Sequence, residues 1–142
     1  MTVLVLLFIV TVQLNPDKKR DAKAVTEFIK QNKKPGDLVI ICTHEFLTNF
    51  AYYYSEDMFK TLGGDEYGAL EAKLHQGNIF PVRRIGEVEK SLLSNSKRII
   101  YLDVGADFSN PGNEVLSTLQ MENRLVDKKN FHGIETVYTF VK

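Results

Sequence analysis

The sequence Leu38-Val39-Ile40-Ile41-Cys42 is a short run rich in β-branched side chains, and Arg98-Ile99-Ile100-Tyr101-Leu102-Asp103-Val104 is a second one. Runs of this kind are typical of strands that are buried on both faces of a parallel sheet. A helical pattern precedes each run, over residues 21–33 and about 86–94. A helix followed by a buried strand is half of a βαβ unit. The two runs therefore predict an α/β fold.

Weaker patterns predict the other elements. Residues 78–82 form a candidate short strand. Pro81 predicts that this strand lies at an edge, because proline donates no hydrogen bond to a neighbouring strand. The side chains of residues 134–141 alternate and predict a last strand. Further helices are expected over residues 45–54, 69–75 and 113–121.

The resulting order alternates strands with helices. This alternation indicates a three-layer αβα sandwich with a Rossmann-like, mainly parallel sheet. The last strand is expected to run antiparallel at or near an edge, because only a short helix and a turn precede it. The chain has 142 residues and no internal repeat or linker, so residues 15–142 are expected to form a single domain.

The first fourteen residues are unusually apolar. Residues 2–14 read TVLVLLFIVTVQL and are followed by Asn15-Pro16-Asp17-Lys18-Lys19-Arg20. Periodicity does not separate helix from strand in so continuous a run. Three interpretations stay open: a first core strand, the end of a transmembrane helix, or a signal-peptide core. A complete span takes about 20 apolar residues, and a signal peptide needs a basic flank and a cleavage site that are missing here.

Charge and composition exclude several classes of protein. The 18 basic and 18 acidic side chains cancel, which argues against a dedicated nucleic-acid binder. The single cysteine excludes an internal disulfide framework and a multi-cysteine metal site. His44, His75 and His132 show no metal-ligand spacing. The glycines form neither a dinucleotide fingerprint nor a P-loop, so the sequence indicates no metal and no other cofactor.

Polar side chains follow both buried runs. His44 and Glu45 come after the first run, and Asp103 and Asp107 stand at the end of the second. Ligands of open α/β sheets bind beyond the carboxyl ends of the strands. If the two strands are neighbours, these four residues converge into a polar cluster with acid–base capacity. The structural alternative is that polar residues gather there because the chain leaves the core.

Two other features also have a functional and a structural interpretation. Cys42 and His44 lie two residues apart, which suits a thiol nucleophile and its base, or Cys42 is a small buried side chain. Tyr53 lies within Tyr52-Tyr53-Tyr54, and tyrosines stack on sugars or lie at membrane interfaces. Three consecutive tyrosines on a helix point in three directions, so at least one is expected to be buried and one exposed.

Several spaced features together resemble a known family. They are Asn15-Pro16 after the apolar run, a basic helix ending in Phe28-Ile29, Lys34-Pro35-Gly36-Asp37 before a β-branched strand, the three tyrosines, the second buried run, and Phe131-His132-Gly133-Ile134 before Val137-Tyr138-Thr139-Phe140. This pattern resembles the C-terminal soluble domain of bacterial membrane glycosyltransferases of the dolichyl-phosphate-mannose protein mannosyltransferase-like family.

The resemblance implies an accessory role. In that family many transmembrane helices precede an extracytoplasmic α/β domain, and the polyprenyl-phosphate-linked sugar donor binds among those helices. The family's catalytic acidic residues lie in an early loop outside this chain, so no catalytic residue is carried over. The expected partners are the membrane and a glycan or lipid-linked sugar on the periplasmic side. The candidate ligand or acceptor surface comprises His44, Glu45, Tyr53, Asp103 and Asp107.

Two other functions stay open. A free-standing cytoplasmic Rossmann-like protein would bind a small phosphorylated or nucleotide ligand at the same strand ends, with residues 2–14 as its first core strand. An interaction module would use the aromatic segment 46–59. The conformation of residues 2–14 distinguishes them, since a central strand favours the free-standing protein and a protruding segment favours the membrane parent.

Overall fold

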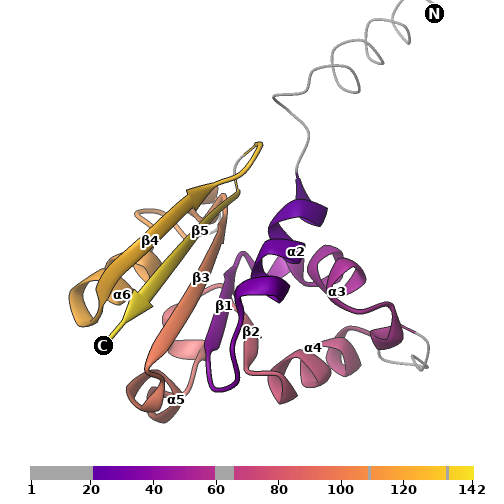
Figure 1. Ribbon diagram of the computed structural model, residues 1–142, viewed down its shortest axis with the longest axis horizontal. Helices are drawn as coiled ribbons and strands as arrows, with labels where there is room; N and C mark the ends of the chain where they lie inside the picture. The colour runs from indigo at the N-terminus through magenta and orange to yellow at the C-terminus, as the bar shows by residue number, and fades with distance from the viewer. Residues whose placement is uncertain (1–20, 60–65, 109, 134) are drawn as a thin grey trace, which may run out of the picture.

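The computed structural model describes residues 21–59, 66–108, 110–133 and 135–142. They form a mixed α/β fold with one five-stranded sheet in the order β2-β1-β3-β5-β4 (Figure 1). Residues 2–14 and the basic sequence that follows them lie outside the described residues. The strands are β1 (Leu38–Cys42), β2 (Ile79–Pro81), β3 (Arg98–Val104), β4 (Arg124–Asn130) and β5 (Glu135–Val141).

The parallel part of the sheet confirms the two buried runs. β1 pairs in parallel with β2 on one side and with β3 on the other, so that Ile40 lies opposite Phe80 and Tyr101. All five residues of β1 are buried. β2 lies at an edge of the sheet, as Pro81 predicted. These strands were predictable because burial on both faces demands an unbroken apolar sequence.

The rest of the sheet differs from the sequence prediction. β5 runs antiparallel, as expected, but it lies between β3 and β4, so the C-terminal strand is not the edge strand. The second edge strand is β4, which the sequence did not predict. With two parallel and two antiparallel pairings, the sheet is mixed rather than mainly parallel. β4 reads RLVDKKN and is exposed at every residue, which explains why it shows no apolar pattern.

The helices agree with the predicted ones to within a few residues. Asp21 caps the first helix, α2, by accepting a hydrogen bond from the Ala24 N–H at 3.2 Å. Short 3₁₀ turns lie at His44–Phe46 (η3), Glu56–Met58 (η4), Ile85–Glu87 (η5) and Ala106–Phe108 (η6). The α-helices are α2 (Ala22–Asn32), α3 (Leu47–Tyr54), α4 (Glu66–Gln76), α5 (Lys90–Asn95) and α6 (Glu114–Glu122). No helix in the described parts of the chain is long and apolar enough to cross a bilayer.

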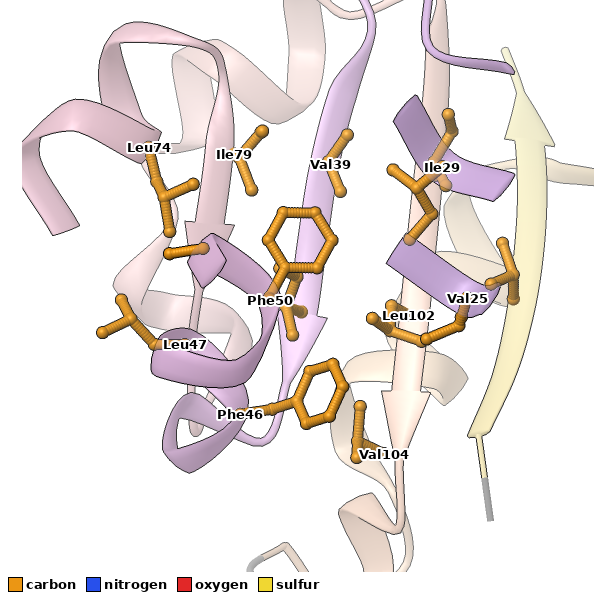
Figure 2. Packing of buried hydrophobic residues seen from close by; sticks show 14 of the residues in the cluster. Val25, Ile29, Val39, Phe46, Leu47, Phe50, Leu74, Ile79, Leu102 and Val104 are labelled. Atoms are coloured by element: carbon orange, nitrogen blue, oxygen red, sulfur yellow. The ribbon is translucent and has the colours of Figure 1, made fainter. Parts of the chain in front are cut away.

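The buried side chains form two clusters, because successive residues of a strand point to opposite faces of the sheet. The first contains alternate residues of β1 and β3 together with residues of α2, α3 and α4. Figure 2 shows Ile29 and Phe50 of this cluster meeting Val39 and Leu102 of the sheet. The second cluster contains the other residues of β1 and β3 together with residues of α5 and α6.

The order of the strands in the sheet changes direction between β1 and β3. The chain passes from β1 to β2 through α3 and α4, which join the first cluster, and from β2 to β3 through α5, which joins the second. After β3 the chain enters α6, which also joins the second cluster. The segments that follow β1 and β3 therefore lie on opposite faces of the sheet. This is the kind of switch point beside which open α/β sheets bind ligands. α2 begins at the same end of the sheet, where β1 and β3 finish (Figure 1).

Candidate functional site

The carboxyl ends of β1 and β3 are adjacent, as the sequence prediction required. Cys42 lies directly opposite Asp103 in the parallel pairing. Beyond this point the side chains engage different elements. His44 contacts α4, whereas Asp103 contacts the loop that leads into α6. We describe these as the histidine group (His44, Tyr67, Glu71, His75) and the aspartate group (Tyr101, Asp103, Asn113).

The histidine group joins the segment after β1 to α4. The Nε2 atoms of His44 and His75 each lie 3.7 Å from the same oxygen, Oε1 of Glu71. The His44 ring stacks beside the Tyr67 ring at 6.4 Å between centroids, and His75 stacks on Phe80 of β2 at 4.4 Å. The His44 side chain is 15% exposed and that of Glu71 is 36% exposed. One carboxylate therefore lies between two imidazoles at the rim of the molecule.

Glu45 is held by an arginine from the segment after β2. Nε and Nη2 of Arg83 both lie 2.9 Å from Oε1 of Glu45. The backbone N–H of Arg83 donates to Glu87 at 3.0 Å. A hydrogen bond from the backbone N–H of Glu45 itself, together with Arg83, lowers the pKa of the Glu45 carboxyl group against the opposing effect of burial. Glu45 is thus an exposed, ionised and partnered carboxylate.

The aspartate group connects β3 to the start of α6. The two carboxylate oxygens of Asp103 accept hydrogen bonds from the Ala106 N–H at 2.9 Å and from Nδ2 of Asn113 at 2.6 Å. Oδ1 of Asn113 accepts from the Tyr101 hydroxyl at 2.9 Å and from the Leu116 N–H at 3.2 Å, which caps α6. Burial raises the pKa of Asp103, and the nearby charge of Asp107 adds to the shift. The group fixes the loop after β3 against the sheet.

Cys42 is a buried member of the second cluster, with none of its surface exposed. Its sulfur lies 4.0 Å from the carbonyl oxygen of Arg83 and beside the Tyr101 hydroxyl. Burial raises the pKa of the thiol to about 11, with contributions from Asp103, Glu45 and Glu87. The thiol is therefore protonated at neutral pH, and His44 is directed toward Glu71. The structural interpretation of Cys42 is confirmed.

The remaining candidates, Tyr53 and Asp107, are exposed. Tyr53 on α3 is 38% exposed and packs edge-on against Tyr52, which is 56% exposed. Tyr54 instead packs against the first cluster and stacks on Phe50 at 5.3 Å. This division confirms that consecutive helical tyrosines point in different directions. Asp107 lies on η6, near Asp103.

Sequence reasoning missed several residues at these strand ends. Glu71 and His75 carry a readable signal, because a spacing of four residues places them on one face of a helix. Asn113 also carries one, since asparagine before a helix is a common cap. Arg83 carries none: its pairing with Glu45 joins residues 38 positions apart. Only the tertiary fold reveals the pairing of Arg83 with Glu45.

The arrangement offers hydrogen-bond donors and acceptors but no metal cage. No group of three or more histidine, cysteine or acidic residues within the described ranges has the geometry to hold a metal ion. Comparison with models of known families, with curated proteins and with solved structures finds no match to this chain.

Proposed function

We propose that this chain is an accessory, non-catalytic domain of a membrane glycosyltransferase, mannosyltransferase-like and supplied by a polyprenyl-phosphate-linked sugar donor. Its fold would be a Rossmann-like αβα sandwich on the periplasmic side of the membrane. The helices that join both core clusters support the sandwich. The carboxyl end of the sheet would contact the sugar or the acceptor.

One observation carries this proposal: α2 begins at the end of the sheet where β1 and β3 finish (Figure 1). The apolar run ends at Leu14, and six residues separate it from Asp21. Six residues span at most about 20 Å even when fully extended. If the apolar run is the end of a membrane span, the start of α2 lies within about that distance of the bilayer surface, and the carboxyl ends of β1 and β3 lie at the same end of the domain (Figure 1). The histidine and aspartate groups at this end would then face the lipid-linked sugar.

The chemistry of the two groups supports an uncharged polyhydroxylated ligand. Glu71, Asp103 and Asp107 supply carboxylates at this end, whereas Glu45 and Arg83 are already paired with each other. Carboxylates accept hydrogen bonds from sugar hydroxyls, and they repel phosphate. The protonated thiol of Cys42 supplies no nucleophile. Binding without catalysis is what an accessory domain requires.

Sequencing the gene upstream of Met1 tests this proposal directly. We expect in-frame codons for several apolar helices. An upstream stop codon with a ribosome-binding site would overturn it.

A transferase assay on the full-length protein provides a second test. The substitution His44→Ala is expected to raise KM for the acceptor several-fold and to leave kcat unchanged, because His44 binds and does not react. Lys23→Ala on the exposed face of α2 serves as a control. A loss of kcat alone in the His44 variant would contradict the accessory role.

A second function is favoured by the switch point between β1 and β3, where open α/β sheets bind small ligands. We propose as this alternative a free-standing cytoplasmic protein that binds a phosphorylated or nucleotide ligand near His44 and Asp103. Thermal-shift measurements on the full chain with nucleotides and sugar phosphates test it. A stabilisation that His44→Ala removes is expected, and no shift with any ligand would overturn it.

A further inference from the structure

We propose that the histidine group is a sugar-binding subsite, in which a pyranose ring lies on Tyr67 and its hydroxyls bind Glu71, His44 and His75. This inference rests on the proposed function, because it names the residues of this end of the domain that would contact the sugar. It adds α4 to a site otherwise formed by the segments after β1 and β3.

Tyr67 provides a stacking surface. The residue is 52% exposed although its ring lies beside that of His44, so much of it remains open to solvent. Aromatic rings pack against the C–H faces of other molecules through their apolar bodies. An exposed ring at the start of a helix, one helical turn before a carboxylate, therefore fits the two requirements of a sugar site.

Glu71 and its two imidazoles provide the polar contacts. Each Nε2–Oε1 separation is 3.7 Å. Hydrogen bonds of this type measure about 2.7–3.2 Å, so the three groups are close without bonding directly to one another. A sugar hydroxyl both donates and accepts hydrogen bonds. One hydroxyl can donate to Glu71 and accept from an imidazole N–H, which satisfies both groups.

The packing around these side chains holds them in place before a ligand binds. His75 stacks on Phe80 at 4.4 Å, and His44 is 15% exposed and lies beside Tyr67. Glu71 and His75 occupy successive turns of α4. Groups that are ordered in advance lose less conformational entropy on binding. The central carboxylate also disfavours a phosphate at this position, which points to an uncharged sugar ring.

Saturation-transfer difference NMR on the full chain tests the subsite, with methyl α-mannoside, methyl α-glucoside and mannose 1-phosphate as probes. We expect weak binding of at least one methyl glycoside and weaker binding of the phosphate. Tyr67→Ala is expected to reduce the affinity about tenfold, and Tyr67→Phe to retain it. Glu71→Gln should weaken binding about fivefold, since the amide accepts fewer hydrogen bonds.

Tyr52→Ala is the matched control, because Tyr52 is similarly exposed, at 56%, and lies on α3. Its binding should equal that of the wild type. Binding that survives Tyr67→Ala, or is lost equally in Tyr52→Ala, would overturn the subsite, as would no binding by the wild type. Binding that depends on Tyr67, found together with an upstream stop codon, would uphold the subsite and overturn the membrane-enzyme proposal.

Discussion

The sheet has two unlike halves. In the parallel half, β1 is buried at every residue, and both of its faces are covered by helices. In the antiparallel half, β4 is exposed at every residue. The two strands belong to the same sheet, with β3 and β5 between them. A sheet therefore does not impose one sequence pattern on its strands; the cover over each strand does.

Aromatic contacts stabilise the exposed strand β4. Lys129 lies 4.2 Å from the ring of Phe28 on α2, and Lys128 lies 5.3 Å from the ring of Tyr138 on β5. The ring of Phe131 meets that of Phe28 at 5.5 Å. Lysines on an edge strand also discourage pairing with another chain. β4 thus protects the sheet and contributes little to its core.

The largest expected effect compares one leucine from each half. Leu102→Ala in β3 should lower the free energy of unfolding by about 2–5 kcal/mol, because Leu102 is completely buried and leaves a cavity. Leu125→Ala in β4 should cost less than about 1 kcal/mol, because Leu125 is 41% exposed. Urea denaturation measures both. Equal losses would mean that β4 is covered in solution, and they would contradict the difference in burial between the two strands.

The next effect concerns the connection between β3 and α6. Asn113→Gly should lower the free energy of unfolding by about 1–3 kcal/mol. It removes the cap of α6 and the side-chain amide that forms hydrogen bonds with Asp103 and Tyr101. Glycine is the suitable replacement, since Asn113 has a φ of 45°. Asn95→Ala at the exposed end of α5 is the control and should cost almost nothing. A stability of Asn113→Gly equal to the control's would show that the aspartate group is not structural.

A pH effect should appear at Cys42. Its thiol pKa rises from 9.0 to about 11 on folding. Because the raised pKa belongs to the folded state, the associated stability is complete below pH 9 and is lost as the pH rises toward 11. Between pH 8 and pH 10.5 the wild type should lose about 1–2 kcal/mol more than Cys42→Ala. Identical pH profiles for the two proteins would mean that the thiol is accessible to solvent.

The smallest effect tests the edge strand itself. Lys129→Ala should cost about 0.5–1 kcal/mol, because it removes a cation from above Phe28 and Phe131. Lys129→Arg should retain the stability, since guanidinium also binds aromatic faces. Chemical denaturation of the three proteins measures the difference. A loss that arginine does not restore would indicate that the ammonium group acts in another way.

The location of the candidate site was predictable from the sequence, whereas the residues that contact His44 and Glu45 were not. His44 and Asp103 could be found because each follows an apolar strand, and those strands were readable. Glu71 and Arg83 could not be assigned to the same region, because α4 and the segment after β2 carry no apolar strand signal. Their side chains reach His44 and Glu45 across 27 and 38 positions of sequence.

By itself the sequence determined the class of fold, the buried strands β1 and β3, the helices around them and the edge position of β2. These features follow from local apolar pattern and from proline chemistry, which do not depend on distant residues. Only the tertiary structure decided that β4 forms the other edge, that β5 lies between β3 and β4, and that Glu71 lies between His44 and His75. The reason is that an exposed strand and a polar contact are stabilised by partners that the local sequence does not contain.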